Sequence, residues 1–222
     1  MTVTANAAST ITIGADVPYP ATAELVTVPS ESSSFGDDAN VSLAQSFEVS
    51  TGFSIASILI PYENDTRANV DWSMTVSIFE VANRFATNFT PSGAAVYTET
   101  FTFPATGNGD GSIAANTEVI AQIDLMTPVP LTASIGMAGY ALQITESSDA
   151  DFNPGFEWLR PTSDQYAGGQ MYEDGVVKNP NATTGLGARD ASFALLAVPI
   201  PEPSAALLSL IGAVCFMRRS RK

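Results

Sequence analysis

The chain contains no histidine and only one cysteine, and both scarcities exclude whole classes of chemistry. Without histidine there is no Ser-His-Asp or Cys-His catalysis, no His-ligated catalytic zinc and no side chain with an ordinary pKa near neutrality. The one cysteine, Cys215, lies inside an apolar run close to the C-terminus. The residues before that run therefore form no disulfide, thiolate metal site or cysteine nucleophile among themselves.

Positive charge is also scarce. The 222 residues include 23 acidic and nine basic ones, and four of the basic residues occupy the last five positions. Outside residues 198–222, which also hold Glu202, the chain carries 22 acidic residues against five basic ones, a balance of −17. A surface of this sign repels nucleic acid and anionic polymers, so no nucleic-acid partner is expected.

Apolar residues are plentiful and follow a period of two. They make up 45% of the chain, which is enough for residues 8–197 to bury the core of one large β-domain. Within the segment VDWSMTVSIFEV, one strand face would hold Val70, Trp72, Met74, Val76 and Ile78. Within GYALQITES, the alternating apolar residues are Tyr140, Leu142 and Ile144.

Further strands are expected where the same alternation recurs between turn-rich segments. The expected strands are residues 26–28, 45–49 and 54–60, together with AAVYTETFTF, EVIAQIDL and SFALLAV. Segments rich in Gly, Asn, Asp and Ser separate them, and no helical window is found before the C-terminal tail. The pattern predicts an all-β domain, a β-sandwich of jelly-roll type.

The C-terminus, VPIPEPSAALLSLIGAVCFMRRSRK, has three parts in a fixed order. A proline-rich spacer comes first, then the uncharged run Ala205–Met217, then a basic end. The 13 residues of the run would form a helix of about 20 Å, which spans a bilayer core of about 30 Å only with local thinning. The basic end would remain cytoplasmic by the positive-inside rule, so the domain would be anchored outside by its C-terminus.

This order of parts resembles the PEP-CTERM sorting signal of bacterial surface proteins. The residues that carry the resemblance are Pro201, Glu202, Pro203, Arg218, Arg219, Arg221 and Lys222. In that family an exosortase, a membrane cysteine protease, cuts near the Pro-Glu-Pro motif. The resemblance implies an exosortase and the inner membrane, through residues 205–217, as partners. It implies a membrane-anchored precursor in the cell envelope and a processed form at the cell surface or outside the cell.

The N-terminus has no leader of its own within its first 20 residues. It does contain Ala5-Asn6-Ala7, which matches the small-residue pattern of a signal-peptidase site. We interpret residues 1–7 as the remainder of a cleavage region and expect the true start upstream of Met1.

Phrases spread over residues 40–197 resemble, in style, the jelly-roll domains anchored on bacterial surfaces. They include LAQSFEVSTGFSIASILIPY and FEWLRPTSDQYAGGQMYEDG. The second phrase also supplies the best ligand-site candidates, because aromatic faces stack on sugar rings while charged groups bond hydroxyls. These candidates are Trp158, Tyr166, Tyr172, Arg160 and Glu157. The alternative is that the rings belong to the core.

No cofactor is expected, with calcium as the one ion considered. Asn108 and Asp110 stand two apart between glycines in TGNGDGS, a spacing that oxygen ligands can use to wrap Ca²⁺. Asp149 and Asp151 form a second candidate. A flexible turn is the favoured interpretation of both segments, since an EF-type loop would need further carboxylates and a distal Glu.

The sequence thus predicts an exported, non-enzymatic surface or extracellular-matrix protein with a structural or interaction role. The alternative is a carbohydrate-binding module of the extracellular polysaccharide. A third hypothesis, a glycan hydrolase or lyase, would need two carboxylates about 5–9 Å apart. Spacing in the sequence places no such pair.

Overall fold

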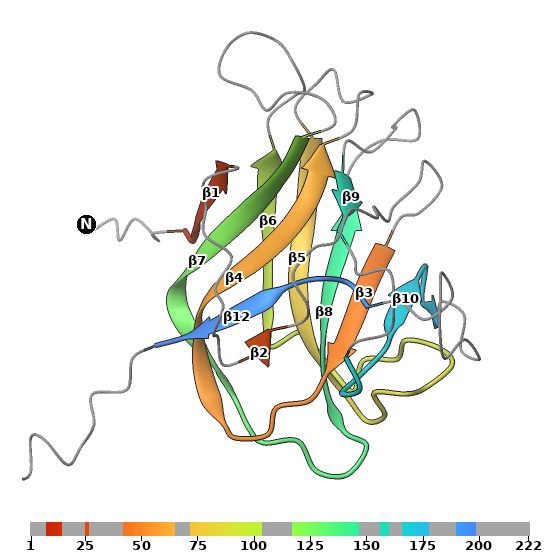
Figure 1. The fold of residues 1–222 in the computed structure, drawn as a ribbon. Helices are drawn as coiled ribbons and strands as arrows, with labels where there is room; N and C mark the ends of the chain where they lie inside the picture. The colour runs from red at the N-terminus through yellow and green to blue at the C-terminus, as the bar shows by residue number, and fades with distance from the viewer. Residues whose placement is uncertain are drawn as a thin grey trace, which may run out of the picture.

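The computed structural model consists of strands, turns and connections in the part of the chain that it describes, with no helix there. Two antiparallel sheets pack face to face as a sandwich (Figure 1). The all-β sandwich expected from the alternating pattern is thereby confirmed. The described residues are 8–14, 25–26, 42–64, 72–103, 117–146, 156–159, 166–177 and 190–198.

Each sheet contains six strands in the described part of the chain. The first sheet has the order β1-β7-β4-β12-β2, with β9 also paired to β4. Its strands are β1 (Thr10–Gly14), β2 (Leu25–Val26), β4 (Phe53–Asn64), β7 (Thr117–Leu131), β9 (Phe156–Trp158) and β12 (Ala194–Ala197).

The second sheet has the order β11-β10-β3-β8-β5-β6. Its strands are β3 (Ser42–Phe47), β5 (Trp72–Val81), β6 (Tyr97–Phe103), β8 (Gly139–Glu146), β10 (Met171–Glu173) and β11 (Val176–Val177). Every strand segment expected from the sequence overlaps one of the strands of the two sheets, with bounds that differ by a few residues.

Four strand pairs enclose one another along the chain. The hairpin β5–β6 is innermost, β4 pairs with β7 around it, β3 pairs with β8 around that, and β2 pairs with β12 outermost. Successive pairs alternate between the second and the first sheet. This nesting makes neighbours of strands that lie far apart in sequence, so the sandwich closes only when both ends of the domain are in place.

The alternating apolar residues face the space between the sheets. In β5, Met74, Val76 and Ile78 are almost completely buried in one main core. The same holds in β8 for Tyr140, Leu142 and Ile144. Val76 stands opposite Ile144, and Ile78 opposite Leu142, so the two strands bury their side chains as cross-strand pairs. Of the expected β5 face, Val70 and the Trp72 side chain lie outside what the structure describes.

β4 departs once from simple alternation. Ile55 and Ile58 are both fully buried in the main core although they are three residues apart. The pairing of β4 with β12 has one extra residue on β4 at this place, a β-bulge, because Ile55 and Ser57 stand opposite the adjacent residues Ala197 and Leu196. The extra residue turns the rest of the strand over, so Ile60 and Tyr62 also face the core. The strict period of two expected for residues 54–60 is wrong at this place.

The β10–β11 hairpin was not among the expected strands. Glu173 pairs with Val176, and the two residues between them both have positive φ, 48° for Asp174 and 79° for Gly175. An Asp-Gly pair in this conformation forms the tight turn that suits the twist of a two-residue hairpin. The Asp174 carboxylate also accepts a hydrogen bond of 2.9 Å from the Ser42 amide. The sequence EDGV, residues 173–176, could have predicted this hairpin.

Gly169 allows the segment before β10 to lie directly on β3. A Cβ atom built on Gly169 would be 1.8 Å from the Ser46 carbonyl oxygen, which is backbone and cannot move aside cheaply. The next residue, Gln170, stabilises this contact through both of its backbone polar groups. Its amide donates to the Ser46 hydroxyl, and its carbonyl accepts from the Ser46 amide, both at 2.9 Å.

We expect Gly169→Ala to destabilise the protein by about 3 kcal/mol or to prevent folding, because the new methyl overlaps backbone. Gly93→Ala is the matched control, since a Cβ there meets nothing within 4 Å. The control should change the free energy of unfolding by no more than about 0.5 kcal/mol. Urea denaturation followed by circular dichroism measures both. Equal midpoints for the two variants would contradict the packing described for Gly169.

Candidate functional site

Two of the predicted ligand residues are part of the interior. Trp158 in β9 has no exposed surface, and its indole N–H donates to the Ser192 carbonyl at 2.6 Å. Tyr172 in β10 is 2% exposed, and its hydroxyl donates to the Arg84 carbonyl at 3.1 Å. Neither ring has a face on which a sugar could stack. This corrects the prediction of an exposed aromatic platform at these two residues.

Tyr166 lies at the edge of the core, and both its hydroxyl group and its backbone amide are hydrogen-bonded. Its hydroxyl accepts a hydrogen bond of 2.8 Å from the Glu48 amide, and its own amide donates to the Asp190 carboxylate at 2.8 Å. Burial raises the pKa of the Tyr166 phenol above its ordinary value. The residue therefore connects two parts of the chain and offers only part of its ring to solvent.

The remaining predicted site residues lie outside the described residues, or their side chains do. Glu157 belongs to β9, where its backbone pairs with Glu63, but its side chain is not described. The others outside the described residues are Arg160, Asn108, Asp110, Asp149 and Asp151, and the sorting residues Pro201, Glu202, Pro203, Arg218, Arg219, Arg221 and Lys222. Within the described ranges, no three His, Cys, Asp or Glu side chains come together as metal ligands. No helix there could cross a bilayer.

The most heavily bonded side chain is Arg84, which the sequence patterns did not single out. It is the one Lys or Arg among the described residues and is 4% exposed. Nε donates to the Gly168 carbonyl at 2.8 Å, and Nη1 donates to the carbonyls of Gly136, at 3.1 Å, and Ala138. Nη2 forms an ion pair of 2.9 Å with Glu48. One feature of the sequence could have drawn attention to Arg84: it is one of few basic residues before the tail, and it follows closely after an expected strand.

Arg84 joins three connections at one end of the sandwich. It stands in the β5–β6 connection, bonds two carbonyls of the β7–β8 connection, and bonds the segment that leads into β10. Its backbone takes part as well, because its amide donates to the Met137 carbonyl at 2.9 Å and its carbonyl accepts from the Ser46 hydroxyl at 2.7 Å. The guanidinium thus supplies the donors that these carbonyls would otherwise lack.

A second buried polar group links β3 to the start of β12. Gln45 is fully buried and donates to the Asp190 carboxylate at 3.1 Å, while its side-chain oxygen accepts from the Ala191 amide at 2.8 Å. Asp190 is 1% exposed and also receives the Tyr166 amide. These hydrogen bonds hold the segment before β12 against the second sheet, so the Asp190 carboxylate has a structural role.

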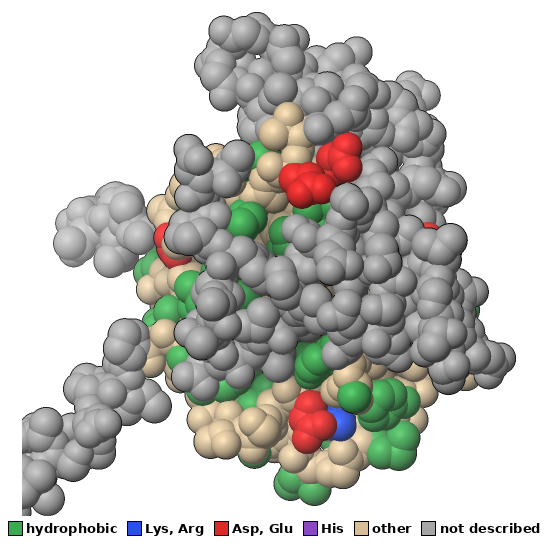
Figure 2. Space-filling view, in the orientation of Figure 1, with side chains coloured by type: hydrophobic (Ala, Val, Ile, Leu, Met, Phe, Trp, Pro, Cys, Tyr) green, Lys and Arg blue, Asp and Glu red, His purple; other side chains and the backbone are tan. Residues whose placement is uncertain are grey.

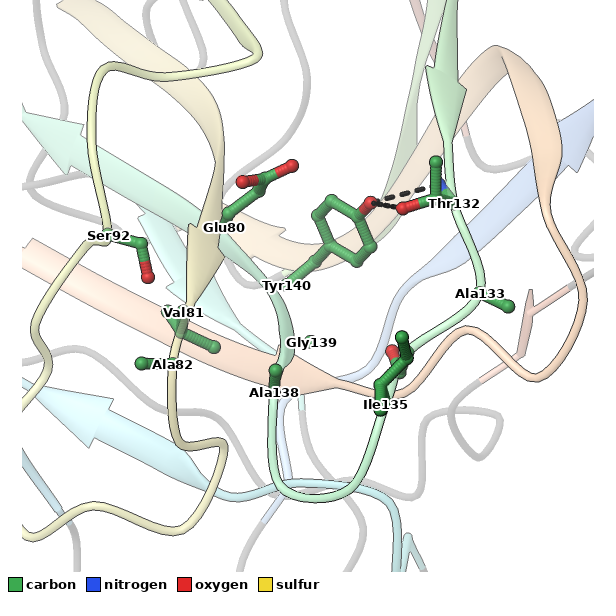
Figure 3. A pocket seen from close by; sticks show the side chains of 11 residues that line it. Glu80, Val81, Ala82, Ser92, Thr132, Ala133, Ile135, Ala138, Gly139 and Tyr140 are labelled. Carbon is green, nitrogen blue, oxygen red and sulfur yellow. Dashed lines mark hydrogen bonds between the residues drawn. The ribbon is translucent and has the colours of Figure 1, made fainter.

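A cavity of about 240 Å³ opens between the connections at this same end (Figure 3). Glu80 comes from β5, Tyr140 from β8, and Thr132 and Ile135 from the β7–β8 connection. The Tyr140 hydroxyl accepts a hydrogen bond of 2.9 Å from the Thr132 amide, which closes one side of the cavity. Glu80 is the one carboxylate among its described lining residues, so this cavity does not supply the pair that glycoside hydrolysis needs.

Comparison with known proteins assigns the chain to no group: no family model, no curated protein and no solved structure matches it.

We expect Arg84→Lys to cost about 3 kcal/mol of unfolding free energy, although it keeps the charge. A lysine ammonium cannot reach all the carbonyls that the guanidinium fork bonds, and each part-buried carbonyl left without this donor costs about 1 kcal/mol or more. Glu48→Gln is the matched control, because its carboxylate is 47% exposed and such pairs contribute about 1 kcal/mol or less. A loss in the control as large as that in Arg84→Lys, by urea denaturation, would mean that the ion pair dominates instead.

Four buried or partly buried tyrosines make the fold sensitive to alkali. Burial raises the phenol pKa of Tyr62, Tyr97, Tyr166 and Tyr172 above the ordinary value of 10.0. The folded state therefore keeps these phenols protonated where the unfolded chain would ionise them. Their stabilisation is complete below pH 10 and decreases as the pH rises above it.

The thermal midpoint should accordingly fall above pH 10, and phenolate absorbance at 295 nm should appear together with unfolding. Tyr97→Phe removes one ionising group and should flatten the pH dependence. Free titration of all tyrosines before unfolding would contradict the burial described for these residues.

Proposed function

We propose that this chain is an exported bacterial surface or extracellular-matrix protein with a non-enzymatic, structural or interaction domain. Its residues 198–222 are a sorting tail of the PEP-CTERM type, which an exosortase recognises and cuts. The support lies in the order of the tail: Pro201-Glu202-Pro203, then the apolar run 205–217, then four basic residues among the last five. The anchor is the inner membrane, and processing takes the domain to the cell surface or beyond.

The position of β12 is the observation that supports this proposal most directly. β12 ends at Ala197 and is paired with β4 on one side and β2 on the other. The Val198 amide then donates to the Ser54 carbonyl at 2.9 Å, and the tail follows at once. A cut near Pro201–Pro203 therefore falls after the last strand and leaves every strand pair of the sandwich in the released product.

A structural role fits the way in which the described polar and aromatic groups are used. Trp158 and Tyr172 fill the interior, Arg84 bonds backbone carbonyls, and Asp190 fixes the entry to β12. These side chains are of types that could recognise a ligand, but here they bond and pack against other parts of the domain. A domain without disulfides gains its rigidity from such buried bonds and from its core.

We assign the sandwich to the jelly-roll type. What supports this is the nesting of β2–β12, β3–β8, β4–β7 and β5–β6 between two sheets, which is how a strand ribbon folded into two Greek keys is wrapped. In this assignment β9, β10 and β11 are additions between β8 and β12, and β1 extends the first sheet beyond β7.

Deletion of residues 204–222 from the native gene tests the sorting role. The full-length protein should give a membrane-associated precursor and a smaller processed form, whereas the truncated protein should be an ordinary secreted one without a membrane precursor. Separation of membrane, envelope and medium, followed by immunoblotting, measures this.

Replacement of Pro201 and Glu202 by alanine is the matched control, since it leaves the apolar run intact. This variant should insert but remain uncut. Identical fractionation of the full-length and truncated proteins would refute the sorting role. Normal processing of the alanine variant would show that recognition lies elsewhere in the tail.

A further inference from the structure

Three exposed apolar side chains cluster at the end of the sandwich where Arg84 joins the connections. Ile135 is 84% exposed, Met137 is 53% exposed and Phe85 is 41% exposed. Single exposed apolar residues are ordinary, but neighbouring ones mark an interaction site more often. We call these three residues the apolar tip. Figure 2 shows apolar side chains gathered at the lower end of the molecule.

The apolar tip is contiguous because Arg84 binds both of its connections. The Arg84 amide donates to the Met137 carbonyl at 2.9 Å, and its guanidinium lies 5.4 Å from the centre of the Phe85 ring. Gly136, between Ile135 and Met137, has a φ of 61° and turns the chain so that both side chains stand at the apex. The tip is therefore held by the fold and presented to the outside.

The chain leaves the sandwich at the same end. Ala197 stands opposite Ile55 in β4, and Ile55 stands opposite Val129 in β7. Only five residues lie between Val129 and Ile135, which limits that stretch to about 20 Å. The spacer between Val198 and the apolar run of the tail, residues 199–204, has six residues and spans at most about 25 Å.

We propose that the apolar tip rests on the surface of the bilayer while the tail is inserted. This rests on the proposed function, because only an inserted tail brings the membrane so close. The spacer keeps the end of β12 within about 25 Å of the bilayer, a distance comparable with the maximum length of the stretch from Val129 to Ile135. Contact through this end would orient the domain and hold the Pro-Glu-Pro motif near the membrane surface, where a membrane protease works.

The charge beside the tip is partly balanced. Glu48 is paired with the Arg84 guanidinium at 2.9 Å, which cancels its charge. Glu80 lines the cavity beside Ile135, so one exposed carboxylate remains next to the tip. Apolar side chains with polar groups directly behind them match the interface, where such residues bury about 5–10 Å deep.

The experiment uses the full chain with Cys215→Ala and one new cysteine, labelled with an environment-sensitive fluorophore. Ile135→Cys places the label on the tip. Thr102→Cys is the matched control, exposed at the far end of β6, where β6 pairs with the start of β5. Both proteins are mixed with phosphatidylcholine vesicles, with or without lipid spin-labelled at a shallow acyl position. Flotation of the vesicles reports insertion of the tail independently.

We expect both proteins to float, with a blue shift and spin-label quenching at position 135 and neither at position 102. Flotation with equal, solvent-like signals at both positions would overturn the tip contact and leave the sorting tail intact. Failure to float would overturn the membrane role of the tail and the tip contact with it. A blue shift at position 135 without vesicles, rising with protein concentration, would mean that a second copy of the chain covers the tip, and would overturn the proposal.

Discussion

The guanidinium of Arg84 is the interaction on which one whole end of the sandwich depends. Three connections meet there, and the guanidinium donates hydrogen bonds to carbonyls of two of them from its place in the third. A buried cation is costly unless its hydrogen bonds are made, and here the carbonyls and Glu48 provide them. Arg84 also contacts both connections of the apolar tip, because its guanidinium lies 5.4 Å from the centre of the Phe85 ring and its amide donates to the Met137 carbonyl.

The rest of the molecule is held by nested strand pairs, one main core and a small second apolar cluster around Tyr172. Along the chain, the pair β2–β12 encloses the pair β3–β8, which in turn encloses the pair β4–β7. Residues near both ends of the domain are therefore needed to complete the first sheet. A chain without disulfides must obtain this closure from burial and hydrogen bonds alone. The buried groups at Gln45 and Asp190 contribute specificity, because they fit one register of β3 against the segment before β12.

Much of the fold was predictable from local patterns, and much of the candidate site was not. Alternation placed Met74, Val76 and Ile78 correctly, because a half-buried strand records its inner face in every second residue. Trp158 and Tyr172 could not be assigned in this way, since an aromatic ring with polar neighbours serves a core and a sugar site equally well in sequence. Their burial depends on Ser192 and Arg84, which are 34 and 88 residues away.

The sequence by itself determined the classes of chemistry that the chain lacks, the all-β character of the domain and the pattern of its tail. These properties are local, because they depend on residue type and on spacing over a few positions. Tertiary structure alone decided which residues share an environment. The bulge in β4, the union of three connections at Arg84 and the position of the apolar tip at the end where the chain leaves all arise from pairings across long separations. No local pattern records them, because each partner is chosen by the closure of the whole sandwich.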